Sequence, residues 1–163
     1  PSGAGRNRGD LPGERGLRLP MATALVRIGR LDHLRTLGDL LGEQRHEVQD
    51  VVPSFLIDLS RSQPEAVAAE LVRLLGEGEP LARENAAWIA GAASAASAGA
   101  TAVALRTALG DAAPGVRAAA AWALGMLRDG GARGPLARLA EGEDREVAAF
   151  AREALVRIGG DAS

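Results

Sequence analysis

The chain has 163 residues and a formal net charge of −2; 47% of its residues are apolar and 2% are aromatic. It has no cysteine, which excludes disulfides, thiolate metal sites and a cysteine nucleophile. Its two histidines, His33 and His46, are too few for a histidine metal cluster or to favour a catalytic triad. The balanced charge argues against a basic nucleic-acid-binding protein.

All basic residues are arginines and alanine is the commonest residue, which indicates a GC-rich, bacterial coding sequence. Residues 1–16 are rich in Gly, Pro and Arg without a helical apolar period, and we expect a disordered tail. This segment lacks the apolar run of a secretory signal. The longest uncharged stretch, 86–105, is interrupted by Gly, Ser and Thr, so no membrane span is expected. The predicted location is cytoplasmic.

Apolar residues at helical spacing predict a lone helix at 17–28, followed by four helix pairs. The pairs, each with a first and a second helix, are 31–41 with 46–60, 64–75 with 80–93, 99–109 with 114–128, and 132–140 with 145–158. Prolines 64, 80, 114 and 135 lie near helix starts, and glycines 42, 76 and 110 lie where first helices stop, as C′ glycines do. Pro53 predicts a kink or a helix start, and 94–99 a flexible loop.

A repeat of 31–34 residues accounts for these pairs. Glu43, Glu77 and Asp111 are 34 residues apart, and the segment 24–29 recurs letter for letter at 154–159. No helix can bury its apolar stripe alone, whereas stacked pairs bury a continuous core. The prediction is an all-α fold, an α-solenoid of about four antiparallel helix pairs plus one N-terminal helix. The single domain spans 17–160, with units at 17–29 (partial), 31–60, 64–93, 99–128 and 132–159.

Asp111 and the segment 116–125 (VRAAAAWALG) resemble the HEAT-repeat family, and more narrowly the bacterial HEAT-like repeats of the phycobilin-lyase type. The resemblance covers 31–159; the last unit departs from it, with Gly142 and Ala148 in place of the acid and the basic residue. It implies a HEAT-like superhelix whose second helices line the concave face. It also implies an inter-repeat ladder of acids and arginines, formed by Glu77, Arg83, Asp111 and Arg117.

On the expected concave face, Trp88 and Trp122 occupy one repeat position, together with Thr23, Ser54 and Glu153. A tryptophan there can anchor a partner, or it can be a lid over small neighbours at the repeat interface. Acids nearby favour a basic or arginine-containing partner. The predicted partner-binding residues are Asp50, Ser54, Asp58, Glu84, Trp88, Trp122, Met126, Glu153 and Arg157.

The sequence therefore favours a non-catalytic protein–protein interaction or scaffold module that binds a protein or peptide segment on this face. No cofactor, metal or catalytic residue is predicted, and no nucleic-acid or membrane partner. Two other functions stay open: a phycobilin-lyase-like enzyme or accessory factor, and a HEAT-like nucleic-acid-binding protein. A homodimer through a terminal repeat is a further alternative.

Overall fold

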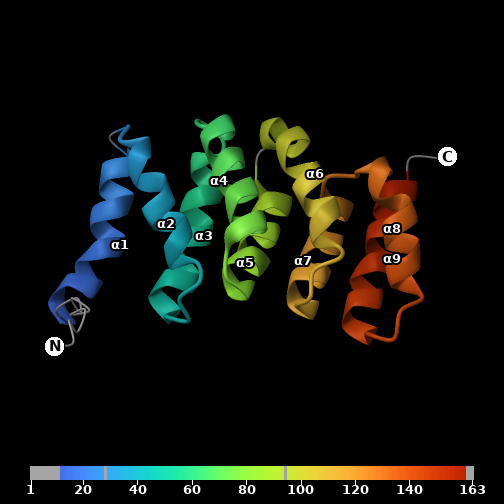
Figure 1. Ribbon diagram of the computed structural model, residues 1–163. Coiled ribbons are helices and arrows are strands. Elements are labelled where there is room, and N and C mark those ends of the chain that lie inside the picture. Colours follow the sequence, from blue (N-terminus) through green and yellow to red (C-terminus); the bar gives the residue numbers. More distant parts are fainter. Residues whose placement is uncertain (1–11, 28, 94, 161–163) are drawn as a thin grey trace, which may run out of the picture.

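The computed structural model describes residues 12–27, 29–93 and 95–160, and every regular element in these ranges is helical (Figure 1). The helices are α1 (Pro12–Arg27), α2 (Leu34–Leu40), α3 (His46–Leu59), α4 (Pro64–Glu77), α5 (Pro80–Ala92), α6 (Ala98–Ala108), α7 (Pro114–Met126), α8 (Arg133–Ala140) and α9 (Arg145–Gly159). Short 3₁₀ turns, Leu31–His33, Ala95–Ser97 and Gly130–Ala132, precede α2, α6 and α8. The fold is all-α, as predicted.

The helix starts follow from local chemistry. Pro64, Pro80 and Pro114 are the first residues of α4, α5 and α7, where the missing N–H leaves no hydrogen bond unmade. Asp144 caps α9, because its carboxylate accepts a hydrogen bond from the Val147 N–H at 3.2 Å. The paired helices lie within two residues of their predicted limits, apart from α2, which begins after a 3₁₀ turn.

Three predictions of helix bounds and connections differ from the structure. Helix α1 begins at Pro12, so residues 12–16 are helical, whereas 1–11 of the predicted tail lie outside the described residues. Helix α3 runs through Pro53, and the prediction of a helix start there is wrong. In the predicted loop 94–99, Ser94 is outside the described residues, 95–97 form a 3₁₀ turn, and α6 begins at Ala98.

The predicted C′ glycines do not adopt the left-handed conformation. Among the described glycines only Gly29, which follows α1, has a positive φ, of 90°. Gly76 lies inside α4, and Gly42 and Gly110 follow helices that end in tight turns with ordinary backbone angles. The left-handed position after α7 is taken by Arg128, with φ 51°.

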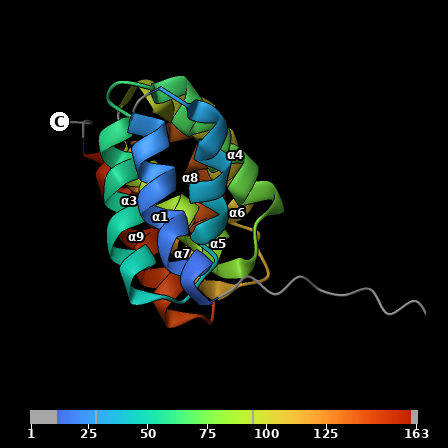
Figure 2. The ribbon, with the colours of Figure 1, turned by 90° about the vertical axis from the view of Figure 1, so that its left-hand side faces the viewer.

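Most helices of the same position in successive pairs pack against each other. Helix α2 contacts α4, and α4 contacts α6; helix α3 contacts α5, α5 contacts α7, and α7 contacts α9. Seen end-on, α3 and α9 lie on one side of the molecule, and α4 and α6 lie on the other (Figure 2). Leu, Val and Ala side chains from α1 to α9 form one continuous core cluster between the helices.

Two glycines set the closest helix approaches. A Cβ added to Gly91 of α5 would lie 2.7 Å from the Ala123 Cα of α7, and one added to Gly125 would lie 2.7 Å from the Ala154 Cα of α9. Backbone therefore meets backbone without intervening side chains, which a Cβ at either glycine would prevent. By the repeat register, Val26 of α1 and Ile57 of α3 occupy the same position. The earlier helices thus carry a branched side chain where α5 and α7 carry none.

None of the described helices is by itself long and apolar enough to cross a membrane. Helix α5 and the stretch Ala95–Ala108 reach that length and apolar character only together, and they are bent by 120° at the break between them.

We expect Gly91→Ala to lower the free energy of unfolding by about 1–3 kcal/mol, because its methyl group overpacks the α5–α7 contact. The clash is with the Ala123 backbone and the Trp122 ring, so no single rotamer change relieves it. Urea denaturation measures the loss.

Gly76→Ala is the matched control, since an added Cβ there meets nothing within 4 Å in α4. Helix propensity then favours alanine, and stability should rise by up to about 1 kcal/mol. Equal effects of the two substitutions would show that close approach at Gly91 is unimportant.

Candidate functional site

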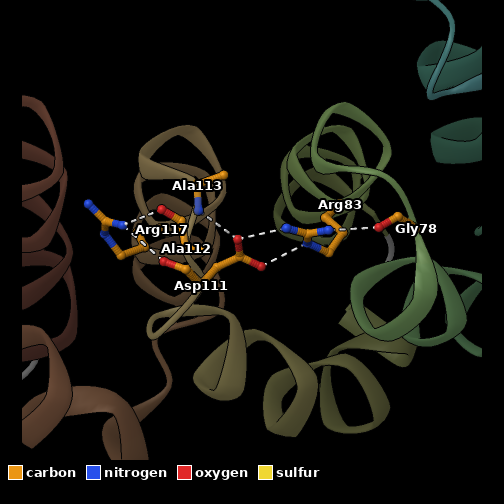
Figure 3. A network of polar contacts seen from close by, with 6 residues as sticks. All are labelled: Gly78, Arg83, Asp111, Ala112, Ala113 and Arg117. Atoms are coloured by element: carbon orange, nitrogen blue, oxygen red, sulfur yellow. Dashed lines mark hydrogen bonds and ion pairs between the residues drawn. The ribbon is translucent and has the colours of Figure 1, made fainter.

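The predicted ladder of acids and arginines links successive units at the turns that precede the second helices. The Arg83 guanidinium donates two hydrogen bonds to the Asp111 carboxylate, at 2.8 and 2.9 Å, and a third to the Gly78 carbonyl at 2.8 Å (Figure 3). One oxygen of Asp111 also accepts from the Ala113 N–H at 2.9 Å. Arg83 thereby joins its own turn to the turn of the next unit.

Arg117 repeats this arrangement one unit later. It donates to the backbone carbonyls of Asp111 and Ala112, at 2.9 and 3.1 Å (Figure 3). It also lies 3.4 Å from the Asp144 carboxylate. Asp144 thus supplies the acid that the last unit lacks at Gly142. In both cases the arginine pairs with the acid of the following unit. It also donates to backbone carbonyls of the turn that precedes its own helix.

Glu77 does not join this ladder, contrary to the prediction. It is the last residue of α4 and is exposed, whereas Arg83 reaches the Gly78 carbonyl within the same turn. In the first unit an amide pair takes the place of the ions. Gln49 donates to the Glu43 carbonyl at 2.7 Å, and Asn85 of the next unit donates to the Gln49 side-chain oxygen at 2.9 Å.

Burial makes the Arg83–Asp111 pair a structural one. Their side chains are 20% and 13% exposed, and both oxygens of Asp111 are engaged. The hydrogen bonds from Arg83 hold the pKa of Asp111 below its ordinary value, and the Ala113 N–H adds to this effect. The same contact with Asp111 raises the pKa of Arg83.

A second ion-pair network, which the sequence analysis missed, ties α2 to α4. Glu70 is buried against Gly38 of α2, where an added Cβ would collide with its carboxylate. Arg73 binds Glu70 and reaches Asp39 of α2 at 2.7 Å. The spacing of 34 residues between Asp39 and Arg73 was the available signal. The hydrogen bond with Glu70 is the main cause that raises the pKa of Arg73.

The two tryptophans contact each other. The Trp88 and Trp122 ring centroids are 4.8 Å apart, and those of Trp88 and Phe150 of α9 are 5.6 Å apart in an edge-to-face arrangement. The Trp122 ring covers Gly91, where an added Cβ would lie 2.6 Å from it. Both indoles are half-buried. These contacts give the pair a packing role across α5, α7 and α9 and leave part of each ring accessible.

Four further predicted residues, Glu84, Met126, Glu153 and Arg157, lie outside the largest described groove, which is between α1 and α3. The Glu84 carboxylate packs over Gly115 in the first turn of α7, where acidic groups are favoured. Met126 is 42% exposed at the end of α7. Glu153 and Arg157 form an exposed ion pair within α9, at 2.8 Å. Glu84 therefore has a packing role against α7, and Met126, Glu153 and Arg157 lie on the surface.

Asp50, Ser54 and Asp58, by contrast, line a groove of about 660 Å³ between α1 and α3. We call it the N-terminal groove; its other lining residues are Thr23, Val26, Arg27, Gly29, Leu31, Val51, Phe55, Leu59, Ser62 and Gln63. The structure therefore brings three predicted partner-binding residues together in one concavity. Thr23 of α1, which shares the repeat position of Ser54, also lines it.

Apolar side chains of the N-terminal groove were missed by the sequence analysis. Val51 is 45% exposed, and Phe55 is half-buried on the groove wall, where it also packs against the core. The guanidinium carbon of Arg27 lies 5.5 Å from the Phe55 ring centroid, at cation–π distance. The spacing of Val51, Phe55 and Leu59, with the exposed acids beside them, was the available signal.

The carboxylates of the N-terminal groove carry only exposed, local partners. Asp50 lies 3.2 Å from the His46 imidazole, and Asp58 lies 2.8 Å from Arg61. All four side chains are largely exposed, so these contacts contribute little to stability. Across the described residues, no group of three or more His, Cys, Asp or Glu side chains could hold a metal ion.

No protein-family model matches this chain, and no curated protein is significantly similar to it.

We expect Asp111→Asn to lower the free energy of unfolding at pH 7 by about 1–3 kcal/mol, because charge-assisted hydrogen bonds from Arg83 are lost. Since the folded-state pKa of Asp111 is lowered, its contribution is present above the unfolded-state pKa of about 4 and is lost as the pH falls below it. Urea denaturation at pH 7 and near pH 3 should show the two proteins converging in acid.

Asp58→Asn is the control for an exposed ion pair, and its cost at pH 7 should stay below about 1 kcal/mol. An Asp111→Asn penalty that is the same at both pH values would contradict the ionic origin of this contribution.

Proposed function

We propose that the chain is a HEAT-like α-solenoid that acts as a non-catalytic interaction or scaffold module, and that its N-terminal groove binds a segment of a partner protein. The solenoid assignment is supported by the repeat of 31–34 residues and by the contacts between helices of successive units. The forward pairing of Arg83 and Arg117 adds to this support, because it recurs from unit to unit.

The N-terminal groove is the single observation that carries the binding function. Its volume of about 660 Å³ falls within the range of ligand-binding clefts, and it combines exposed Val51 and half-buried Phe55 with the polar side chains of Asp50 and Asp58. Apolar surface bordered by charged groups is typical of protein interaction sites. The Trp88–Trp122 pair is less suited to anchoring a partner, because its rings already pack on each other and on Gly91.

The helix spacing gives a reason for the groove at this end of the array. At the repeat position where Gly91 and Gly125 allow close contact, α1 carries Val26. Its branched side chain is buried and is one of the residues that line the groove. Two aspartates on the α3 wall would repel phosphate groups, so a protein segment fits the groove better than a nucleic acid.

A peptide-library selection on the purified protein tests the proposed function. Selected peptides should bind the wild-type protein, and Val51→Glu should weaken that binding at least tenfold, because it places a charge on the apolar wall. Fluorescence anisotropy with labelled peptides measures the affinity. Val51 is exposed, so the variant should keep the wild-type unfolding midpoint.

Val103→Glu is the matched control, since Val103 is 61% exposed on α6 and does not line the N-terminal groove. It should leave peptide affinity unchanged. A selection without enriched binders, or peptides that bind Val51→Glu as tightly as wild type, would refute the groove as the binding site.

A further inference from the structure

The α3 wall of the N-terminal groove has two parallel lines of side chains. Asp50, Ser54 and Asp58 are four residues apart, and therefore form a polar line along one face of the helix. Val51, Phe55 and Leu59 form an apolar line directly beside it. The two carboxylates are separated by about 12 Å along the axis, at 1.5 Å per residue.

The apolar line already holds one guanidinium. Arg27 of α1 lies over the Phe55 ring at 5.5 Å, although Arg27 is itself exposed. The groove therefore accommodates an arginine side chain against an aromatic face, with the Asp50 and Asp58 carboxylates on the same wall. Among the side chains that the structure describes, Arg27 is the one basic residue that lines the groove, against the two acids Asp50 and Asp58, so this lining has a net negative charge.

The present partners of the two acids are easily exchanged. His46 is the first residue of α3, and Arg61 lies in the turn just after it. Their side chains are 92% and 73% exposed, and they contact Asp50 and Asp58, respectively. An incoming cation that is partly shielded from water in the groove would compete well with such exposed contacts.

From this arrangement we infer that the occupant of the N-terminal groove is an arginine-bearing amphipathic helix of a partner protein. Two arginines seven or eight residues apart, two helical turns, match the separation of Asp50 and Asp58. An adjacent apolar stripe of the same helix covers Val51 and Phe55. This inference rests on the proposed function and specifies the chemistry of its ligand.

The probe is a synthetic helical peptide with two arginines seven residues apart and leucines on the adjacent stripe. Two matched peptides carry glutamine or glutamate in place of both arginines. The arginine peptide should bind most tightly, the glutamate peptide should bind least, and added salt should weaken the arginine peptide.

Variants of exposed groove residues give the decisive comparison. Asp50→Asn and Asp58→Asn should each weaken the arginine peptide by about two- to tenfold, whereas Glu47→Gln, on an exposed part of α3 outside the groove lining, should not. Arg27→Met should tighten the arginine peptide, because it removes a like charge and keeps an apolar stem. A merely structural role of Arg27 predicts no such gain.

Three outcomes overturn the inference. In the first, peptides from the library selection need Val51 but lack arginine and bind Asp50→Asn and Asp58→Asn normally; the groove function then stands and its ligand is different. In the second, Arg27→Met weakens binding, which indicates an acidic partner. In the third, the wild-type protein is a dimer that Val51→Glu dissociates, so a second copy occupies the groove. If no selected peptide is weakened by Val51→Glu, the proposed function is refuted as well.

Discussion

Direct backbone contact between α5, α7 and α9 is the constraint on which the C-terminal part of the structure depends. At Gly91 and Gly125 there is no side chain to hold the next helix away, so α7 is enclosed by its neighbours and its alanines are almost completely buried. Trp122 then lies across Gly91 and packs on Trp88. Glycine in a helix is intrinsically unfavourable, but close packing at these two positions offsets that cost.

Much of the fold could be predicted from the sequence, because each helix carries local signals. Prolines at first helical positions and apolar residues at helical spacing placed the paired helices within a few residues. The errors came from competing effects. Pro53 lacks one hydrogen-bond donor, yet α3 keeps its buried stripe of Val48, Val52 and Leu56 by running through it. The spacing of Gly42, Gly76 and Gly110 indicated helix ends but not their backbone angles.

The candidate site was only half predictable. Register placed Asp50, Ser54 and Asp58 on one face of α3, which a single helix determines. The distance between α1 and α3 depends on side chains of several helices, so the groove itself had no local signal. Only the helical spacing of Val51, Phe55 and Leu59 indicated an apolar line on α3. The ladder shows a similar limit. Its acids and arginines were recognised by their spacing, but the local backbone geometry leaves Glu77 out of the ladder and makes Asp144 the partner of Arg117.

The Arg83 contacts also determine how one unit responds to its neighbour. The guanidinium donates hydrogen bonds to the Gly78 carbonyl of its own turn and to the Asp111 carboxylate of the following turn (Figure 3). That carboxylate in turn accepts a hydrogen bond from the Ala113 N–H, directly before α7. A displacement of one turn is therefore passed to the next through a short chain of charged hydrogen bonds. Between the first and second full units, Gln49 and Asn85 make a corresponding link with neutral groups. The ladder is therefore ionic between the later units and neutral between the first two full units, whereas Arg73 and Asp39 join α4 to α2 of those first two units by an ion pair. Its chemistry thus changes along the chain although the helices that it links are alike.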